Sequence, residues 1–148
     1  LEIGGKGDDL PNIEAAVKEA NVEKNVRFLG FLSEEDKAKA MARATITATM
    51  AEKEGWGITV IESNAAGTPV VGSNVQGLRD SIVDGKTGLL AEPGSSADLA
   101  EKIISLLKDR ERLQKIEAEA RAWAATFTWE RSAEYFIERA KQEIAAAK

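Results

Sequence analysis

The sequence predicts an α/β fold in which a parallel sheet is flanked by helices. Short stretches rich in β-branched or aliphatic residues, such as 26–30, 45–49 and 68–73, alternate with longer stretches of helical periodicity. Strands that alternate with helices form parallel sheets through right-handed crossovers. With 148 residues, of which 43% are hydrophobic, the chain is long enough for one compact domain over 1–148 with its own core.

The N-terminal residues predict a strand followed by a helix. Residues 1–3 suit a strand that enters the glycine-rich turn GGKG at 4–7. Apolar residues then recur at helical spacing, and this stripe is expected to face the core: Ile13, Ala16, Val17 and Ala20. Asn21 suits the end of this helix.

A second strand, a helix and a third strand follow. Residues 26–30 predict a short strand, and Ser33 with Asp36 has the spacing of a capping box for a helix that reaches about Arg43. Residues 45–49 read TITAT, which suits a strand but is polar for the middle of a buried parallel sheet. Burying an unpaired hydroxyl costs about 1–3 kcal/mol, so these threonines are expected to bond to neighbours or to face solvent in part.

The central stretch predicts a turn, a helix, a strand and a loop. Residues 54–57 (EGWG) form the turn, and the amphipathic run after them suits a helix that ends at Gly67. Pro69 fixes the turn into the next strand. A further turn, DGKTG at 84–88, leads into a short strand at 89–91.

Three apolar patterns predict three helices in the C-terminal third. The first pattern comprises Leu99, Ile103, Leu106 and Leu107. The second comprises Leu113, Ile116, Ala120, Trp123 and Phe127. Thr128 suits the N-cap of a final helix over 128–148. The apolar residues of that helix are Trp129, Ala133, Phe136, Ile137, Ala140 and Ile144. Trp123, Trp129 and Phe136 are expected in the core or on a docking surface, and not to stack on a nucleotide base.

Composition excludes several classes of function. The net charge of -5 argues against broad nucleic-acid binding, which needs a basic surface. The absence of cysteine excludes disulfides and thiolate metal sites, and the absence of histidine removes the usual general base and zinc ligand. No run approaches the ~20 apolar residues of a membrane span, and no secretion-signal pattern opens the chain. We therefore expect a cytoplasmic protein.

The turn at 54–57 is the candidate ligand site. Gly55 and Gly57 have no Cβ, so the backbone can approach a ligand closely, and the helix start after them favours anions. Glu54 and Glu62 frame this helix start, with seven residues between them. Because carboxylates accept hydrogen bonds and repel phosphates, their natural partners beside a bound phosphate are hydroxyls, as on a ribose or a hexose.

Four blocks in this order resemble one family: EGWG at 54–57, ESNAAGTPVVGS at 62–73, GLRDSIVDGKTGLL at 77–90 and FTW at 127–129. The pair of glutamates separated by seven residues resembles the signature of retaining glycosyltransferases with the GT-B fold. This large family contains sucrose synthases, bacterial glycogen synthases and α-mannosyltransferases. The resemblance implies a Rossmann-like parallel sheet that forms one half of a GT-B fold, the half that binds the nucleotide sugar.

The resemblance also implies roles for individual residues. Glu62 corresponds to the glutamate that binds the ribose hydroxyls. The alternative interpretation is that Glu62 is an ordinary solvated carboxylate on a helix. Glu54 corresponds to the glutamate that contacts and positions the donor sugar, which makes it the candidate catalytic residue; its alternative is a loop charge. Donor contacts are implied for four backbone amides, those of Gly55, Trp56, Gly57 and Ile58. The side chain of Trp56 itself is expected to pack.

Three further glycines have two interpretations. By resemblance, Gly5 and Gly7 lie near the donor and Gly30 near the nucleotide base, whereas an ordinary turn explains Gly5 and Gly7 equally well. No cofactor and no metal site are expected, because folds of this type generally work without a bound metal and the chain has no DxD-like cluster. The expected cosubstrate is a nucleoside-diphosphate sugar.

The resemblance has gaps as well. Met50 and Ala51 stand where the family usually has a proline and a serine. The arginine and lysine that neutralise the leaving diphosphate, and the N-terminal acceptor domain, are expected to precede this chain. We therefore expect the isolated chain to bind nucleotide but to transfer little or no sugar, and to self-associate through a strand edge left exposed by truncation. The alternative is a noncatalytic nucleotide-binding or scaffold module that pairs with itself or with another chain, favoured if the first or last element carries a flat apolar surface.

Overall fold

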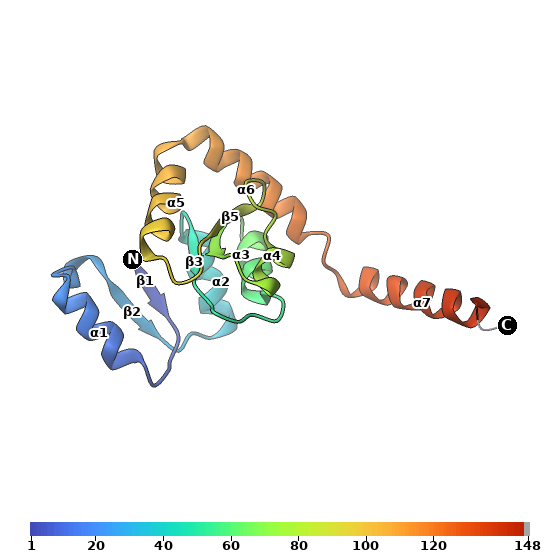
Figure 1. Ribbon diagram of the computed structural model, residues 1–148, viewed down its shortest axis with the longest axis horizontal. Helices are drawn as coiled ribbons and strands as arrows, with labels where there is room; N and C mark the ends of the chain where they lie inside the picture. Colours follow the sequence, from blue (N-terminus) through green and yellow to red (C-terminus); the bar gives the residue numbers. More distant parts are fainter. Residues whose placement is uncertain (147–148) are drawn as a thin grey trace. The chain divides into compact units, whose positions relative to one another are not determined.

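The computed structural model describes residues 1–146 of the chain. They fall into two compact units, Leu1–Ala40 and Met41–Lys148, the second of which includes the two residues outside the description. Figure 1 labels the helices and strands along the chain. The prediction of one domain over 1–148 stays a prediction, and each unit is described by itself.

The first unit is built on two parallel strands, β1 (Glu2–Gly4) and β2 (Arg27–Gly30), with Ile3 opposite Phe28. The connection between them consists of α1 (Leu10–Glu19) and a short 3-10 helix, η1 (Glu23–Asn25). The predicted strand, helix and strand are therefore confirmed.

Asn21 ends α1 as predicted. It has a φ of 54° and lies in the left-handed region. Its amide donates to the carbonyl of Lys18, and the amide of Val22 donates to that of Val17 over 3.2 Å, the two bonds of a Schellman motif.

The predicted core stripe of α1 is wrong. No residue of α1 is buried, and Ile13 is 37% exposed. The sheet of this unit has only two strands, which offer too little surface to cover a ten-residue helix. The apolar spacing predicts the helix correctly, but the expectation that its apolar side is covered is wrong.

Helix α2 (Glu34–Arg43) begins in the first unit and ends in the second. The amide of Asp36 donates to Ser33 Oγ over 3.1 Å, and Ser33 Oγ donates to the Asp36 carboxylate over 2.7 Å. The predicted capping pair is confirmed, and Met41 in the last turn is buried.

The second unit is built on a parallel sheet of three strands in the order β3 (Thr47–Thr49), β4 (Val70–Ser73) and β5 (Gly88–Ala91). Val71 of the central strand lies opposite Ala48 and Leu89. Every residue of β4 is buried, as expected of a strand with a neighbour on each side.

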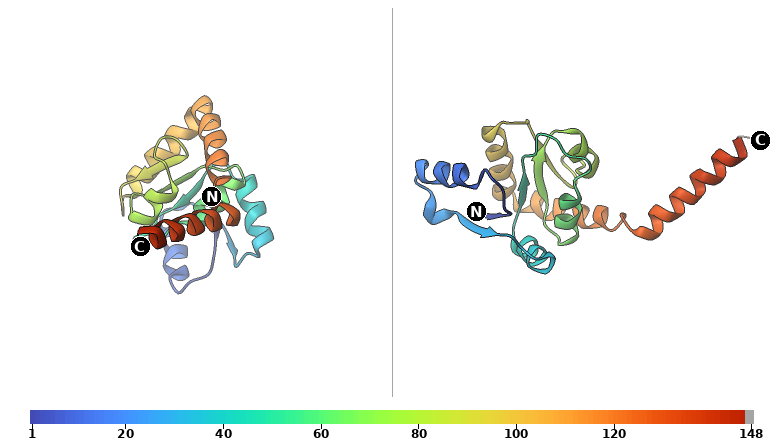
Figure 2. Two further views of the ribbon diagram at one scale, coloured as in Figure 1. Left: turned by 90° about the vertical axis from the view of Figure 1, so that its right-hand side faces the viewer. Right: turned by 90° about the horizontal axis from the view of Figure 1, so that it is seen from below.

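Helices cover both faces of this sheet (Figure 2). One face carries α3 (Ile58–Ala65) and α4 (Gln76–Ser81), and the other carries α5 (Ser96–Lys108). Helix α6 (Arg110–Ala124) packs on the α5 side through Leu113 and Ile116, and its later turns pack against α3. The cluster on the α3–α4 side contains Val60, Val70, Leu78 and Ile82. The cluster on the α5–α6 side contains Val71, Leu89, Ala91, Leu106, Leu113 and Ile116. Consecutive strand residues enter opposite clusters, because side chains alternate across a sheet.

The threonines of 45–49 behave as predicted, since Thr45 is exposed, Thr49 is half-buried and Thr47 forms a hydrogen bond. Thr47 Oγ1 bonds to Ser63 Oγ, which donates to the carbonyl of Thr68 over 2.9 Å. Thr68 Oγ1 in turn donates to the carbonyl of Met41 over 2.7 Å. These bonds connect α2, β3, α3 and the start of β4. Because each hydroxyl has a hydrogen-bond partner, its burial carries no penalty for an unpaired polar group.

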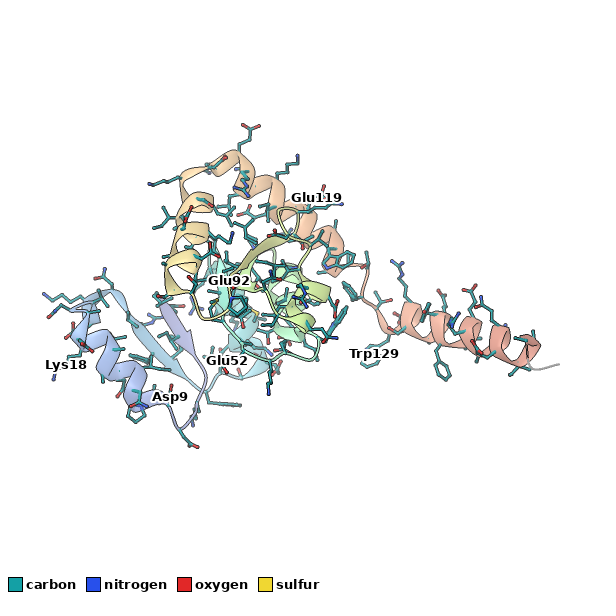
Figure 3. The ribbon with its side chains drawn as sticks, in the orientation of Figure 1. Asp9, Lys18, Glu52, Glu92, Glu119 and Trp129 are labelled. Atoms are coloured by element: carbon teal, nitrogen blue, oxygen red, sulfur yellow. The ribbon has the colours of Figure 1, made fainter. Side chains whose placement is uncertain are left out.

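The final helix, α7 (Trp129–Ala146), has the predicted start, because the amide of Arg131 donates to Thr128 Oγ1 over 3.2 Å. The last two residues of the predicted range 128–148 lie outside the described residues. No described residue of α7 is buried, so its apolar side chains are not in the core. The exposed large ones are Trp129 (labelled in Figure 3), Tyr135, Phe136, Ile137 and Ile144. Within residues 1–146, no helix is long and apolar enough to cross a membrane.

Candidate functional site

The candidate site is the loop of residues 54–57, hereafter the glycine loop, which joins β3 to α3. Gly57 is the N-cap of α3 and has a φ of 88°, a conformation that strongly favours glycine. Its carbonyl accepts the amides of Val60 and Ile61, so α3 begins at Ile58. The loop therefore leads directly into the positive end of a helix dipole.

The Glu54 carboxylate is bound by the backbone of its own loop. Its Oε1 accepts hydrogen bonds from the amides of Gly55, Trp56 and Gly57 over 3.0, 3.4 and 3.2 Å. Three consecutive amides thus converge on one negatively charged oxygen. Such a concave set of amides is an anion-binding arrangement, and it consists of residues that the sequence assigns to the donor site.

Helix α4 supports the loop from the side. The amide of Gly77 donates to the carbonyl of Glu54 over 3.2 Å. At Gly57 an added Cβ would lie 2.5 Å from Ser81 Oγ, so the loop packs directly on α4. Sequence reasoning did not single out Gly77; the available signal was its place at the start of the matched block at 77–90.

An aromatic group covers the other side of the loop. Trp56 meets Phe127 edge to face, with ring centroids 5.4 Å apart, and Phe127 meets Trp123 in the same way at 4.9 Å. Trp123 Nε1 donates to the carbonyl of Ser81 over 2.9 Å. The predicted packing of Trp56 is confirmed, and these contacts bring the EGWG and FTW blocks together.

Glu62 lies in the second turn of α3 and is half-buried. Gly67 ends this helix as predicted, with a φ of 91° and the Schellman bonds from Gly67 to Asn64 and from Thr68 to Ser63. Two cations follow the loop in the sequence. Lys86 pairs with Glu119 of α6 over 3.5 Å, and Arg79 donates to the carbonyl of Asn74 over 3.3 Å.

The remaining predicted residues lie in the first unit, where the ends of β1 and β2 bring two of them together. The amide of Gly5 donates to the carbonyl of Gly30 over 2.8 Å, and Gly30 has a φ of 64°. A Cβ added at Gly5, Gly7 or Gly30 would meet nothing within 4 Å. The backbone at these glycines is therefore open to solvent or to a ligand.

Two surface hollows lie elsewhere in the second unit. One, of about 560 Å³, is lined by residues of α6 and its C-cap Ala125, and the other, of about 450 Å³, lies between α6 and the turn at 85–86. Neither contains a predicted site residue. Within residues 1–146, no group of three or more acidic, histidine or cysteine side chains could hold a metal ion.

A parallel α/β sheet with converging amides at the carboxyl end of a strand is typical of the nucleotide-binding class of α/β proteins. The family model described as "Glycosyl transferases group 1" matches residues 1–123, and the chain belongs to this family. The predicted family is thus confirmed.

Curated relatives cover nearly the whole chain. It is 34% identical over 142 residues to a D-inositol 3-phosphate glycosyltransferase from Nocardia farcinica, with 93% of the chain and 32% of the relative covered. It is 33% identical over 121 residues to an N-acetyl-alpha-D-glucosaminyl L-malate synthase from Bacillus anthracis, with 82% of the chain and 31% of the relative covered. The chain therefore spans about a third of the length of these relatives.

Solved structures of GT-B glycosyltransferases share the fold. Anabaena HepE in complex with UDP and glucose matches with a TM-score of 0.86 and 25% identity, over 95% of this chain and 40% of that protein. Sucrose-phosphate synthase from Thermosynechococcus elongatus matches with a TM-score of 0.84 and 30% identity, over 99% of this chain and 38% of that protein. The predicted fold class is confirmed.

Proposed function

We propose that the chain is the nucleotide-sugar-binding domain of a retaining glycosyltransferase, and that the glycine loop holds the donor. The observation that carries this proposal is the convergence of the Gly55, Trp56 and Gly57 amides at the start of α3. The similarity to HepE, whose structure contains UDP and glucose, supports a nucleoside-diphosphate sugar as the ligand.

Each part of the donor has a proposed partner. The amides of the glycine loop, together with that of Ile58, serve the sugar and the diphosphate, because backbone donors at a helix start favour negative oxygen atoms. Glu62 accepts hydrogen bonds from the ribose hydroxyls, and Glu54 accepts them from the donor sugar. By the same resemblance, Gly5 and Gly7 are proposed to lie near the donor and Gly30 near its nucleotide base.

Donor binding changes the role of Glu54 in this proposal. Its Oε1 bonds to the three loop amides that the donor also requires. Because a carboxylate and a diphosphate repel each other, the side chain leaves the amides when the donor arrives and turns to the hydroxyls of the sugar. The loop amides thus remain paired in both states.

In this proposal the domain has two roles in catalysis: it orients the donor, and it stabilises the leaving diphosphate. Preorganised amides achieve both without reorganisation during the reaction. The acceptor hydroxyl is supplied by a second domain, which fits a chain that spans about a third of its relatives. We propose that the isolated chain binds nucleotide in the cytoplasm and transfers little or no sugar.

Titration with UDP, GDP and ADP tests the binding proposal. Trp56 lies in the glycine loop, so its fluorescence and the amide NMR signals of residues 55–58 are expected to change with one nucleotide more than with the others. Glu62→Ala is expected to weaken that binding, because the ribose hydroxyls lose their acceptor. Glu101→Ala, which removes an exposed carboxylate from α5, is the matched control. Unchanged binding in Glu62→Ala would contradict the ribose assignment.

Incubation with nucleotide sugars tests the inactivity of the isolated chain. The purified protein is expected to release no nucleoside diphosphate from UDP-, GDP- or ADP-linked sugars beyond the background without protein. Turnover that follows the protein through purification would contradict this expectation.

A second candidate function is a noncatalytic module that pairs with itself or another chain. The observation in its favour is α7, whose large apolar residues are exposed. Self-association is expected, and mass measurement in solution checks it: a monomer throughout the micromolar range would refute it. Nucleotide binding without any transfer after addition of an acceptor domain would favour this candidate over the first.

A further inference from the structure

We propose that Phe127, which lies outside the glycine loop and meets Trp56 of that loop, is a positioning residue for it. Its ring lies between two others, with centroid distances of 5.4 Å to Trp56 and 4.9 Å to Trp123. We call the three rings of Trp56, Trp123 and Phe127 the aromatic clasp. The role of the clasp in donor binding rests on the proposed function, whereas its effect on loop order does not.

The clasp closes a ring of contacts around the loop. Trp56 is followed in the chain by Gly57, which packs against Ser81. The carbonyl of Ser81 accepts the Trp123 indole N–H over 2.9 Å. Trp123 contacts Phe127, which contacts Trp56 again. The loop is therefore held between α4 on one side and the end of α6 on the other.

Phe127 links the other two members of the clasp, because its ring meets both Trp56 and Trp123. Trp123 has its indole hydrogen bond as well as its ring contact, and Trp56 belongs to the loop itself. The backbone at Phe127 is fixed by its amide, which donates to the carbonyl of Ala124 over 3.1 Å. Edge-to-face geometry depends on ring orientation, so an aliphatic side chain at this position fills space without directing Trp56.

The ring contact with Phe127 restrains Trp56, the middle residue of the three whose amides converge on Glu54. The hydrogen bond from the Trp56 amide to the Glu54 carboxylate is 3.4 Å long, longer than those from Gly55 and Gly57. The Trp56 side chain is 39% exposed. A rotation of this residue would turn its amide away from the site where the three amides converge. Phe127 thus fixes the middle of the three donors from outside the loop.

The test compares four variants by backbone NMR relaxation without ligand. Phe127→Ala removes the ring, Phe127→Leu keeps the apolar volume, and Phe127→Tyr keeps the ring edge. Trp129→Ala, two residues away and 89% exposed in the wild type, is the matched control. The order parameters of the amides of 55–57 are expected to be about 0.85, as in rigid backbone, in the wild type, Phe127→Tyr and Trp129→Ala. In Phe127→Ala and Phe127→Leu they are expected to fall below about 0.6.

If Phe127→Leu folds, as its NMR spectrum will show, and the order parameters of amides 55–57 are unchanged in it, the proposal is overturned. This variant alone decides the test if Phe127→Ala does not fold. Lower order parameters of amides 55–57 in Phe127→Tyr or Trp129→Ala as well would also overturn the proposal, because increased flexibility of the whole region would then explain the effect. UDP affinity is expected to fall about two- to thirteenfold in Phe127→Leu, the range that corresponds to the loss of one aromatic contact. If the wild type binds no nucleotide, the proposed function fails while the order parameters still test the clasp.

Discussion

The amide of Gly77 donates a hydrogen bond to the carbonyl oxygen of Glu54, and the two backbones are so close that no side chain fits between them. A Cβ added at Gly77 would overlap the carbonyl oxygen of Glu54 and the carbonyl carbon of Gly55. The start of α4 and the start of the glycine loop are therefore packed backbone to backbone. The loop that is proposed to bind the donor has a rigid neighbour on this side.

Gly77→Ala is expected to displace the glycine loop. Backbone atoms cannot give way as a flexible side chain does, so the variant should lose about 1–3 kcal/mol of unfolding free energy and most of its nucleotide affinity. Urea unfolding and UDP titration measure the two effects. Gly55→Ala is the stability control, because a Cβ there meets nothing within 4 Å. Equal stability of the two variants would contradict the close approach.

Gly57→Ala combines strain with a clash, and Gly85→Ala separates the two. Both glycines are left-handed, with φ values of 88° and 74°, which costs about 1–2 kcal/mol for a residue with a Cβ. Only at Gly57 would the Cβ also meet Ser81 Oγ and the Leu78 side chain, while Gly85 is open. Thermal unfolding should therefore show the larger loss in Gly57→Ala, by about a further 1–3 kcal/mol. Similar losses would mean that the loop moves away from α4 without cost.

Asn64→Leu is expected to stabilise the protein. Among the described residues, Asn64 is fully buried in α3 and neither polar atom of its side chain has a hydrogen-bond partner. Leaving such a group unpaired costs about 1–3 kcal/mol, and leucine fills a similar shape without polar atoms. Ser63→Ala, at a buried neighbour that is fully bonded, should instead destabilise. Urea unfolding of both variants gives the signs, and a less stable Asn64→Leu would reveal an unrecognised partner of the amide.

Local signals in the sequence predicted local structure well. The helix caps at Ser33 and Thr128 and the helix ends at Asn21 and Gly67 are all present, because each depends on a few neighbouring residues. The elements between them follow from the same periodicities that set the predicted fold class.

Long-range contacts were the part that the sequence did not reveal. The approach of Gly77 to Glu54 joins segments more than twenty residues apart, and the contact of Phe127 with Trp56 joins segments about seventy apart. No local pattern encodes such distances, and the family resemblance gave the order of these blocks without predicting that they meet at the glycine loop. The apolar stripe of α1 shows the opposite failure, since a periodic pattern marks a face to be covered but does not say what covers it.

Replacing Glu54 tests whether its charge blocks the converging amides. Glu54→Gln keeps an oxygen acceptor but removes the charge, so loop order should persist while inorganic sulfate binds more tightly than to the wild type. Glu54→Ala removes the acceptor as well and should lose about 0.5–2 kcal/mol of stability, as a lost helix cap does. Glu52→Gln removes the same charge two residues away, while the three loop amides remain bonded to Glu54. Sulfate titrations followed at the amide signals of Gly55, Trp56 and Gly57 compare the variants. A gain in sulfate affinity as large in Glu52→Gln as in Glu54→Gln would show that net charge, and not occupancy of the amides, controls anion binding at this loop.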